Sequence, residues 1–293
     1  MKNNPCIASI IVPTTRDRGP VLPFSVGSIL RQTIKEIEVL IIGDGVDSST
    51  RLVIEELMNE DQRIRFFDYP KGSRRGEIYR HEVLTTQAQG EIICYLLDRD
   101  LMLPDHVEKM ILNLHDHNFC VQASIGIRED HSIYMLRKYQ IGDHIERHKT
   151  GPVKNGSFYF SQVGHSLELY KNLPFGWRTT PLKYKTDAYM WRQFVAYHET
   201  TIKSTTDLTI LYFKRGNFPG QSAEKRALDL KLFYKVLDDE HWIREVKDKV
   251  FFELVSDYEF AMNQTFLIKG RTWKELPRTL LNKWVLDHFA KRR

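Results

Sequence analysis

Two carboxylates, Asp98 and Asp100, flank Arg99 directly after an apolar run from Ile92 to Leu97. In an extended segment residues i and i+2 point to one side and residue i+1 to the other, so the carboxylates can converge while the arginine turns away. Hard divalent cations such as Mg²⁺ and Mn²⁺ prefer oxygen ligands and share them with substrate phosphates. The pattern predicts a metal site, and a solvated turn is the alternative because aspartate is common in turns.

A second group suited to phosphate is the basic stretch "PKGSRRGEIYR", in which Lys71, Arg74, Arg75 and Arg80 surround two glycines just before a predicted helix. A glycine-bearing loop at a helix N-terminus can bind phosphate through backbone amides and guanidinium groups. The alternative is a solvated surface loop. The patterns G-x-x-x-x-G-K-[ST] and G-x-G-x-x-G are missing from the sequence, which weighs against P-loop NTPases and dinucleotide enzymes.

These groups must be positioned by the alternating strands and helices of the first 130 residues. Continuous apolar runs indicate strands covered on both faces, and the helical periodicity between them indicates βαβ units. The predicted fold is α/β, with a Rossmann-like, mostly parallel sheet flanked by helices. The predicted strands are 6–13, 37–44, 63–70, 91–97 and 119–127.

The helix ends carry recognisable signals. Ser48 or Ser49 is the expected N-cap of the second helix, and Gly90 is the expected C-terminal signal of the third. Asp105 with Glu108 forms a predicted capping box at the start of the fourth.

Ligands of open parallel sheets bind beyond the carboxyl ends of the strands. Pro13 and Thr14 follow the first predicted strand, Asp44 ends the second, and the pair Asp98 and Asp100 follows the fourth. We therefore expect these side chains to share one edge of the sheet.

Composition sets limits on the function. The chain has 293 residues, a net charge of +5 and three widely spaced cysteines, which we interpret as reduced thiols. The charge favours anionic partners such as a nucleotide, a membrane surface or nucleic acid. There is no apolar run of about 18 residues, so no transmembrane helix is expected, and the N-terminal residues lack the apolar region of a signal peptide.

The stretches "ASIIVPTTRDR", "SVGSILRQT", "IEVLIIGDG" and "GEIYRHEVLTTQAQGEIICYLLDRDLMLPDHVEKM" follow one another in an order and spacing that resembles the family 2 glycosyltransferases. The resemblance covers residues 6–115 well and extends loosely to about 215. It implies the A-type glycosyltransferase fold and the use of nucleotide-activated sugars.

The resemblance implies that Pro13 and Thr14 line the nucleoside pocket. It implies that Asp44 accepts a hydrogen bond from the base, typically uracil. The family usually has two aspartates before the glycine here, whereas this chain has Gly43, Asp44 and Gly45.

Three further positions complete the implied donor site. Arg80 would approach the nucleotide or its diphosphate, Asp98 would face the ribose or the ion, and Asp100 would be the principal ligand of Mn²⁺ or Mg²⁺. The family usually has asparagine after the arginine, where this chain has His81.

The resemblance also implies a catalytic base. "KYKTDAYMWRQFVAYH" looks like the family's helix that begins with Glu-Asp, with Thr186 in place of the glutamate and Asp187 at the base position. The alternative is that Asp187 only benefits from the dipole at the helix N-terminus. His165 and Trp177 lie on the expected acceptor side, where a substrate contact and a packing role are both open.

The expected activity is inverting transfer of one hexose from a nucleoside-diphosphate sugar, expected to be a UDP-sugar, to a glycan or lipid-linked acceptor in cell-surface polysaccharide biosynthesis. A non-processive enzyme is expected because the Gln-x-x-Arg-Trp motif of processive synthases is missing. The alternative is a non-catalytic nucleotide-sugar or glycan-binding protein of the same fold. Nucleic-acid binding finds no recognisable motif.

The expected organisation is a glycosyltransferase domain, 1–220, followed by a helical C-terminal extension, 221–293. Within the domain, 1–115 is the nucleotide-sugar-binding half and 116–220 the acceptor half. A basic amphipathic helix near the C-terminus either lies on an anionic membrane or docks on its own domain. The expected location is the cytoplasm, with peripheral membrane contact at the inner face through that helix as the open alternative.

Overall fold

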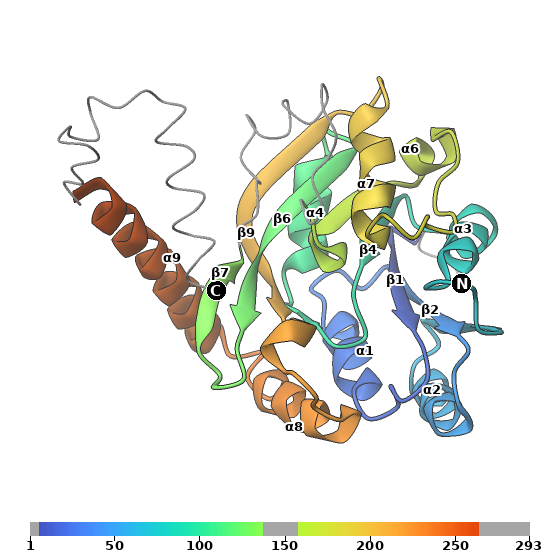
Figure 1. Cartoon of the computed structure of the whole chain (residues 1–293), viewed down its shortest axis with the longest axis horizontal. Coiled ribbons are helices and arrows are strands. Elements are labelled where there is room, and N and C mark those ends of the chain that lie inside the picture. The colour runs from blue at the N-terminus through green and yellow to red at the C-terminus, as the bar shows by residue number, and fades with distance from the viewer. Residues whose placement is uncertain (1–5, 137–157, 264–293) are drawn as a thin grey trace. The chain divides into compact units, whose positions relative to one another are not determined.

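The protein was analysed as a computed structural model that describes residues 6–136 and 158–263 (Figure 1). The strands are β1 Ala8–Thr14, β2 Ile37–Asp44, β3 Ile64–Tyr69, β4 Ile92–Tyr95, β5 Leu101–Met102, β6 Phe119–Ile127, β7 Ile133–Leu136, β8 Val163–Ser166 and β9 Ile202–Tyr212. The α-helices are α1 Leu22–Leu30, α2 Ser48–Glu60, α3 Glu77–Thr86, α4 His106–Leu114, α6 Leu167–Asn172, α7 Thr186–Ala196, α8 Ala223–Tyr234 and α9 Glu240–Asn263.

Within the described residues, the strands form one mixed sheet in the order β3-β2-β1-β4-β8-β6-β9-β5, with β7 paired to β6. The first four in this order are parallel to one another. β8 is antiparallel to both β4 and β6, while β9 is parallel to β6. The predicted α/β class with a flanked, mostly parallel sheet is confirmed, and the antiparallel strands lie in its second half.

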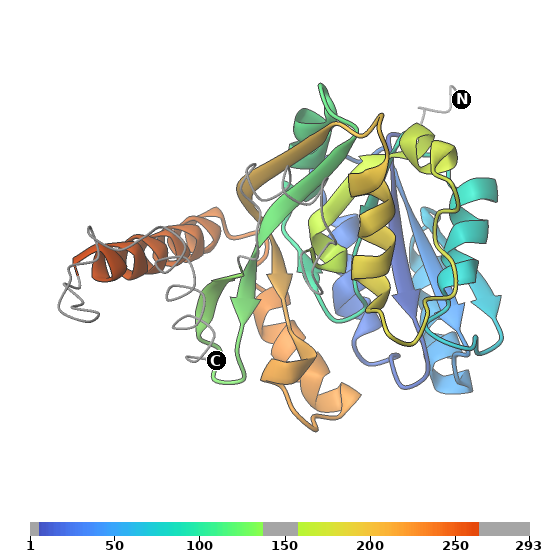
Figure 2. The same cartoon turned by 45° about the horizontal axis from the view of Figure 1, so that its top comes forward.

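Helices cover both faces of the sheet (Figure 2). Successive side chains of a strand point to opposite faces. Ile11 of β1 packs in an apolar cluster with residues of α3 and α7, whereas Ile10 and Val12 pack in a second cluster with residues of α1 and α2. A strand buried on both faces has no polar side, which is why its sequence reads as a continuous apolar run.

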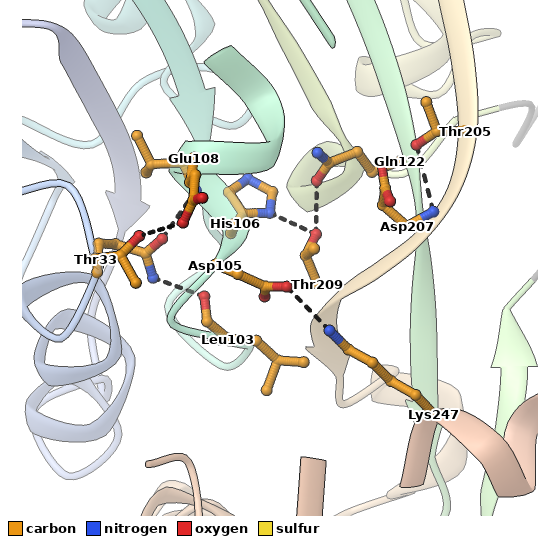
Figure 3. A network of polar contacts seen from close by, with 12 residues as sticks. Thr33, Leu103, Asp105, His106, Glu108, Gln122, Thr205, Asp207, Thr209 and Lys247 are labelled. Atoms are coloured by element: carbon orange, nitrogen blue, oxygen red, sulfur yellow. Dashed lines mark hydrogen bonds and ion pairs between the residues drawn. The ribbon is translucent and has the colours of Figure 1, made fainter. Parts of the chain in front are cut away.

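The predicted N-cap residue of α2 is wrong, whereas Asp105 is the N-cap residue of α4 as predicted but does not form the predicted capping box. Asp47 is the N-cap of α2, and its Oδ1 accepts a hydrogen bond from the Thr50 amide (2.8 Å). Asp105 does not cap α4 through its side chain; its Oδ2 accepts a hydrogen bond from Lys247 Nζ (3.0 Å). Glu108 accepts a hydrogen bond from Thr33 instead (Figure 3). In α2 the capping residue is one position earlier than predicted, and in α4 both carboxylates bond to residues outside the helix.

Gly90 does not end α3, whose C-cap is Gln87. The chain at Gly90 instead passes so close to β1 that an added Cβ would lie 2.4 Å from the Ser9 amide nitrogen. The Gly90 amide donates a hydrogen bond to Ser9 Oγ (2.9 Å). The glycine is therefore required by a close approach of two backbone segments.

The internal contacts of the chain divide it into two units, Met1–Asp248 and Lys249–Arg293. α8 lies in the first unit, where the Tyr234 ring meets Phe24 of α1 edge-on at 5.6 Å. The predicted domain boundary at residue 220 stays a prediction, and the predicted amphipathic helix near the C-terminus falls outside the described residues. Within the described part, no helix is long and apolar enough to cross a membrane.

Candidate active site at the carboxyl ends of the parallel strands

The ends of β1 and β4 meet through Thr14 and Asp98. Thr14 Oγ1 donates a hydrogen bond to Asp98 Oδ2 (3.1 Å), and Arg18 Nε lies 3.5 Å from the same oxygen. Ser25 of α1 donates to the Asp98 carbonyl oxygen (2.6 Å), which fixes the turn that follows β4. The side chain of Asp98 is therefore held against the nucleoside position that the sequence predicts for Pro13 and Thr14.

Asp100 is buried at the end of β9. Its Oδ2 accepts a hydrogen bond from Ser161 Oγ (2.6 Å), and its Oδ1 accepts one from the Phe213 amide (3.1 Å). Burial raises the pKa of Asp100 to about 6 despite the nearby Arg99 guanidinium and these hydrogen bonds, and the negative charge of Asp98 adds to the rise. The ionised carboxylate thus lies where another positive charge would stabilise it.

The two carboxylates fit a hard divalent ion. Both offer oxygen atoms, the preferred donors of Mg²⁺ and Mn²⁺, and each oxygen that accepts one hydrogen bond still has a second lone pair. No group of three ligating side chains occurs among the described residues. The other ligands would therefore be water and substrate phosphate, as is usual for Mg²⁺.

Arg99 points to a recess of its own. Phe213, Phe218, Arg226 and Leu230 line this recess together with Arg99. Burial lowers the pKa of Arg99, but the negative charges of Asp100 and Asp98, together with smaller contributions, outweigh burial and raise it. The expected extended geometry is not found, because Asp98 and Arg99 lie in a turn closed by a hydrogen bond from the Asp100 amide to the Leu97 carbonyl oxygen (3.0 Å). A metal ion shared by Asp98 and Asp100 stays a prediction.

Asp44 ends β2 and is engaged by the basic loop. Its carboxylate forms an ion pair with Lys71 and accepts a hydrogen bond from the Gly72 amide (2.6 Å). Gly76, at a φ of 65°, brings the backbone beside Asp44, where an added Cβ would lie 3.0 Å from the Asp44 Cβ. The loop that the sequence predicts to bind phosphate therefore lies next to the residue predicted to bind the base.

Arg80 is buried behind this loop. Its guanidinium lies 4.5 Å from the Trp177 ring centroid and donates a hydrogen bond to the Arg75 carbonyl oxygen (2.9 Å). Burial lowers the pKa of Arg80, and the negative charges of Glu77 and Asp187 oppose that change. Arg80 is thus a buried cation between the predicted donor site and the predicted base.

Asp187 lies in the first turn of α7, close to three arginines. Burial raises the pKa of its carboxyl group, and Arg80, Arg75 and Arg99 lower it, in that order of effect. Of these arginines, Arg99 also acts on Asp100, so its charge links the two carboxyl groups. Asp187 is therefore electrostatically part of the group formed at the strand ends.

Sequence reasoning missed Glu77, the first residue of α3. Its Oε1 accepts weak hydrogen bonds from the Thr180 amide and from Thr186 Oγ1, both at 3.4 Å, and its Oε2 accepts one from the Arg75 amide (2.9 Å). A single buried carboxylate thus joins the start of α3 to the start of α7. Its only sequence signal is an acidic residue inside a basic stretch.

His165 and Trp177 have packing roles. His165 Nε2 and Tyr95 Oη lie 2.7 Å apart, and Trp177 Nε1 donates to the same hydroxyl (3.4 Å). Both side chains are almost completely buried, and Trp177 packs edge-on against Trp191. Their contacts favour the packing interpretation over sugar stacking.

Comparison with known proteins gives consistent results. The family model described as Glycosyl transferase family 2 matches residues 9–180, more than half of the chain. The chain is 24% identical over 284 residues to GalNAc(5)-diNAcBac-PP-undecaprenol beta-1,3-glucosyltransferase of Campylobacter jejuni, an alignment that covers 93% of this chain and 86% of that protein.

Solved structures share the fold at low identity. One is S. aureus TarS 1-349 in complex with UDP-GlcNAc, with a TM-score of 0.55, 14% identity, and coverage of 88% of this chain and 76% of that one. Another is the mannosyltransferase PcManGT from Pyrobaculum calidifontis in complex with GDP-Man and Mn²⁺, with a TM-score of 0.52, 13% identity, and coverage of 89% and 81%.

Proposed function

Because this chain belongs to glycosyl transferase family 2 and is therefore a glycosyltransferase, we propose that it moves one hexose from a nucleoside-diphosphate sugar to a lipid-linked glycan. The nucleoside is expected to be uridine. The observation that carries the proposal is the contact of Thr14 with Asp98 at the strand ends, with Asp100 buried close enough for the charge of Asp98 to act on it. The charge of Arg99 acts on both Asp100 and Asp187. The named acceptor of the Campylobacter relative, a polyprenyl diphosphate glycan, supports the acceptor class.

The proposed donor site is built from residues at the ends of β1, β2 and β4. Thr14 and Asp44 hold the nucleoside, and Asp98 holds the ribose or the ion. A bound Mn²⁺ or Mg²⁺ on Asp98 and Asp100 would neutralise the charge that develops on the departing diphosphate. The PcManGT complex with GDP-Man and Mn²⁺ supports this ion class for the fold.

Asp187 is the proposed catalytic base. Its carboxylate accepts the proton of the acceptor hydroxyl as the oxygen bonds to the anomeric carbon and the bond to the diphosphate breaks. Attack from the face opposite the leaving group inverts the anomeric configuration. Positioned general-base catalysis of this kind contributes about 10²- to 10⁴-fold in rate.

The proposed setting is the biosynthesis of cell-surface polysaccharide, in the cytoplasm and next to the membrane that carries the acceptor. One sugar is added in each encounter. The prediction of peripheral membrane contact through the C-terminal helix stays a prediction.

The test is a panel of sugar nucleotides with Mn²⁺ and a polyprenyl diphosphate glycan, followed by release of nucleoside diphosphate. We expect turnover with at least one donor, loss of turnover on chelation, and a fall in kcat of about 10²- to 10⁴-fold in Asp187→Asn. Asp100→Ala should abolish the response to Mn²⁺. Glu168→Gln, a carboxylate change in the first turn of α6, is the matched control and should keep full activity.

A separate result would contradict each of the three parts of the proposal: the base, the metal and the catalytic activity. Undiminished turnover in Asp187→Asn would overturn the base assignment, and indifference to chelator would overturn the metal assignment. Binding of a sugar nucleotide without turnover on any acceptor would favour the non-catalytic alternative.

A further inference from the structure

The connection between α6 and α7 displays apolar side chains to solvent next to the proposed base. It spans residues 173–185 and runs along the outside of the molecule (Figures 1 and 2). Leu182 is 84% exposed and Phe175 is 45% exposed. Two large apolar side chains of one short connection are therefore accessible to a partner.

The same connection is strongly basic. The connection contains Arg178, Lys183 and Lys185, Lys171 precedes it in α6, and no acidic residue occurs between Glu168 and Asp187. All four cationic side chains belong to exposed residues. Exposed leucine and phenylalanine interleaved with lysine and arginine match a surface that is apolar inside and anionic outside, which is the surface of an anionic lipid bilayer.

Hydrogen bonds to α6 and α7 fix the backbone of the connection, so its exposed side chains are held in place. The Trp177 amide donates a hydrogen bond to Tyr170 Oη (2.9 Å), and Gln193 of α7 donates to the Gly176 carbonyl oxygen (2.7 Å). Within the connection, the Arg178 guanidinium lies 3.6 Å from the Phe175 ring centroid. The loop therefore has a buried side facing the fold and an exposed side with a fixed composition.

Two tyrosines complete the match to a lipid interface. Tyr184 and Tyr189 stack with their ring centroids 5.4 Å apart, at the junction of the connection with α7. Tyrosine is enriched at the level of lipid headgroups because its ring is apolar and its hydroxyl is polar.

We propose that the 173–185 connection docks on the anionic surface of a lipid bilayer through Leu182 and Phe175, with Lys183 and Lys185 on the headgroups. The inference rests on the proposed function, because docking here brings the headgroup of a lipid-linked acceptor to Asp187. The charge of the connection selects this occupant over a second copy of the chain, whose net charge of +5 would oppose a contact between two basic loops.

The test is co-sedimentation of the full chain with vesicles of phosphatidylcholine alone and with vesicles that also contain phosphatidylglycerol. We expect binding to the anionic vesicles only, weakened by salt. Lys183→Gln with Lys185→Gln should lower the partition coefficient by about tenfold, and Leu182→Ser should lower it by about fivefold. Transfer to a water-soluble acceptor should be unchanged in these variants.

Matched controls place the same changes elsewhere. Leu52→Ser changes an α2 side chain that is 59% exposed. The second control is Lys231→Gln in α8 with Lys235→Gln at its C-cap. Both controls should bind vesicles like the unmodified chain.

Equal binding by the connection variants and the controls would overturn the proposal. So would a self-association that Leu182→Ser removes while vesicle binding stays intact. Vesicle binding needs no donor, so failure of sugar transfer with every acceptor would count against the proposed function and leave this result standing.

Discussion

Asp187 lies in surroundings that act on its charge in opposite directions. Burial favours the neutral acid and raises its pKa, while Arg80, Arg75 and Arg99 favour the carboxylate and lower the pKa. A general base works only when it is ionised, and it works best with a pKa near the operating pH. The net rise in pKa moves the proposed base Asp187 toward that optimum, while the three arginines limit the rise.

Removing one of these arginines should therefore change the pH dependence of the reaction. In Arg75→Gln the carboxylate of Asp187 loses a stabilising positive charge, so its pKa rises further. Activity requires the ionised form, so we expect the acidic limb of the kcat profile to move to higher pH. The measurement is kcat at saturating substrate across the acid range.

Arg51→Gln is the matched control, because Arg51 of α2 is paired with Asp68 of β3 and is not among the charges that act on Asp187. Its profile should coincide with that of the unmodified chain. An acidic limb that stays in place in Arg75→Gln, or moves to lower pH, would contradict the electrostatic role of Arg75.

At the scale of single residues, the strand ends could be predicted and their partners could not. The positions of Thr14, Asp44 and Asp98 follow from apolar runs and from the parallel register of the strands. Glu77 was missed because its partners, Thr180 and Thr186, lie more than a hundred positions away in the sequence. Contacts of that kind depend on the finished fold, and a single sequence carries no local pattern for them.

At the scale of secondary structure, Gly90 allows the segment before β4 to pass close to β1. Alanine at this position would place a methyl group against the backbone of Ala8 and Ser9, which cannot move without disturbing β1. We expect Gly90→Ala to lower the free energy of unfolding by about 1–3 kcal/mol. Chemical denaturation followed by circular dichroism measures the difference.

Gly216→Ala is the control, since an added Cβ there would meet only the end of the Lys214 side chain, at 3.8 Å. It should change the free energy of unfolding little. A Gly90→Ala variant as stable as the Gly216→Ala variant would show that the approach to β1 is not tight.

The five predicted strands all appear, and β1, β2, β4 and β6 are buried along almost their whole length. β3 lies at the edge of the sheet and is only partly buried, but its apolar residues Ile64, Phe66 and Phe67 still mark it. β9, Ile202–Tyr212, escaped prediction because its first half is rich in serine, threonine and charged residues and is only partly buried. β8 is short and lies within an aromatic-rich region without a clear period. Sequence patterns report burial, so strands that are half exposed give a weak signal.

At the scale of the whole molecule, two buried histidines make stability depend on pH. The pKa of His106 and that of His165 are both lowered from 6.5 to about 4 by burial. Thr209 donates its hydroxyl hydrogen to Gln122, so its oxygen accepts from His106 Nδ1 (2.8 Å), and His106 Nε2 has no partner among the described residues (Figure 3). Protonating Nε2 would create a buried charge without a partner.

The unfolded chain therefore binds more protons than the folded one between the two pKa values. Stability from neutral histidine is complete above pH 6.5 and is lost as the pH falls toward 4. We expect each histidine to contribute a loss of up to about 1.4 kcal/mol per pH unit in this window. The free energy of unfolding, measured by denaturant titration at several pH values, gives the slope.

His106→Gln should reduce that slope, whatever its effect on stability at neutral pH. His115→Gln is the control because the His115 side chain is 81% exposed, and it should leave the slope unchanged. Equal slopes in both variants would remove His106 as a source of the acid sensitivity.

The carboxylate of Glu77 has a practical consequence for recombination between relatives. A chimera that joined residues 1–115 of this chain to the acceptor half of another glycosyltransferase would keep Glu77 and lose Thr180 and Thr186 as its donors. Glu77 would then keep the Arg75 amide as a donor but lose both links to the start of α7, and a buried carboxylate with fewer donors is less stable. Grafts should therefore transplant positions 77, 180 and 186 as one inseparable unit.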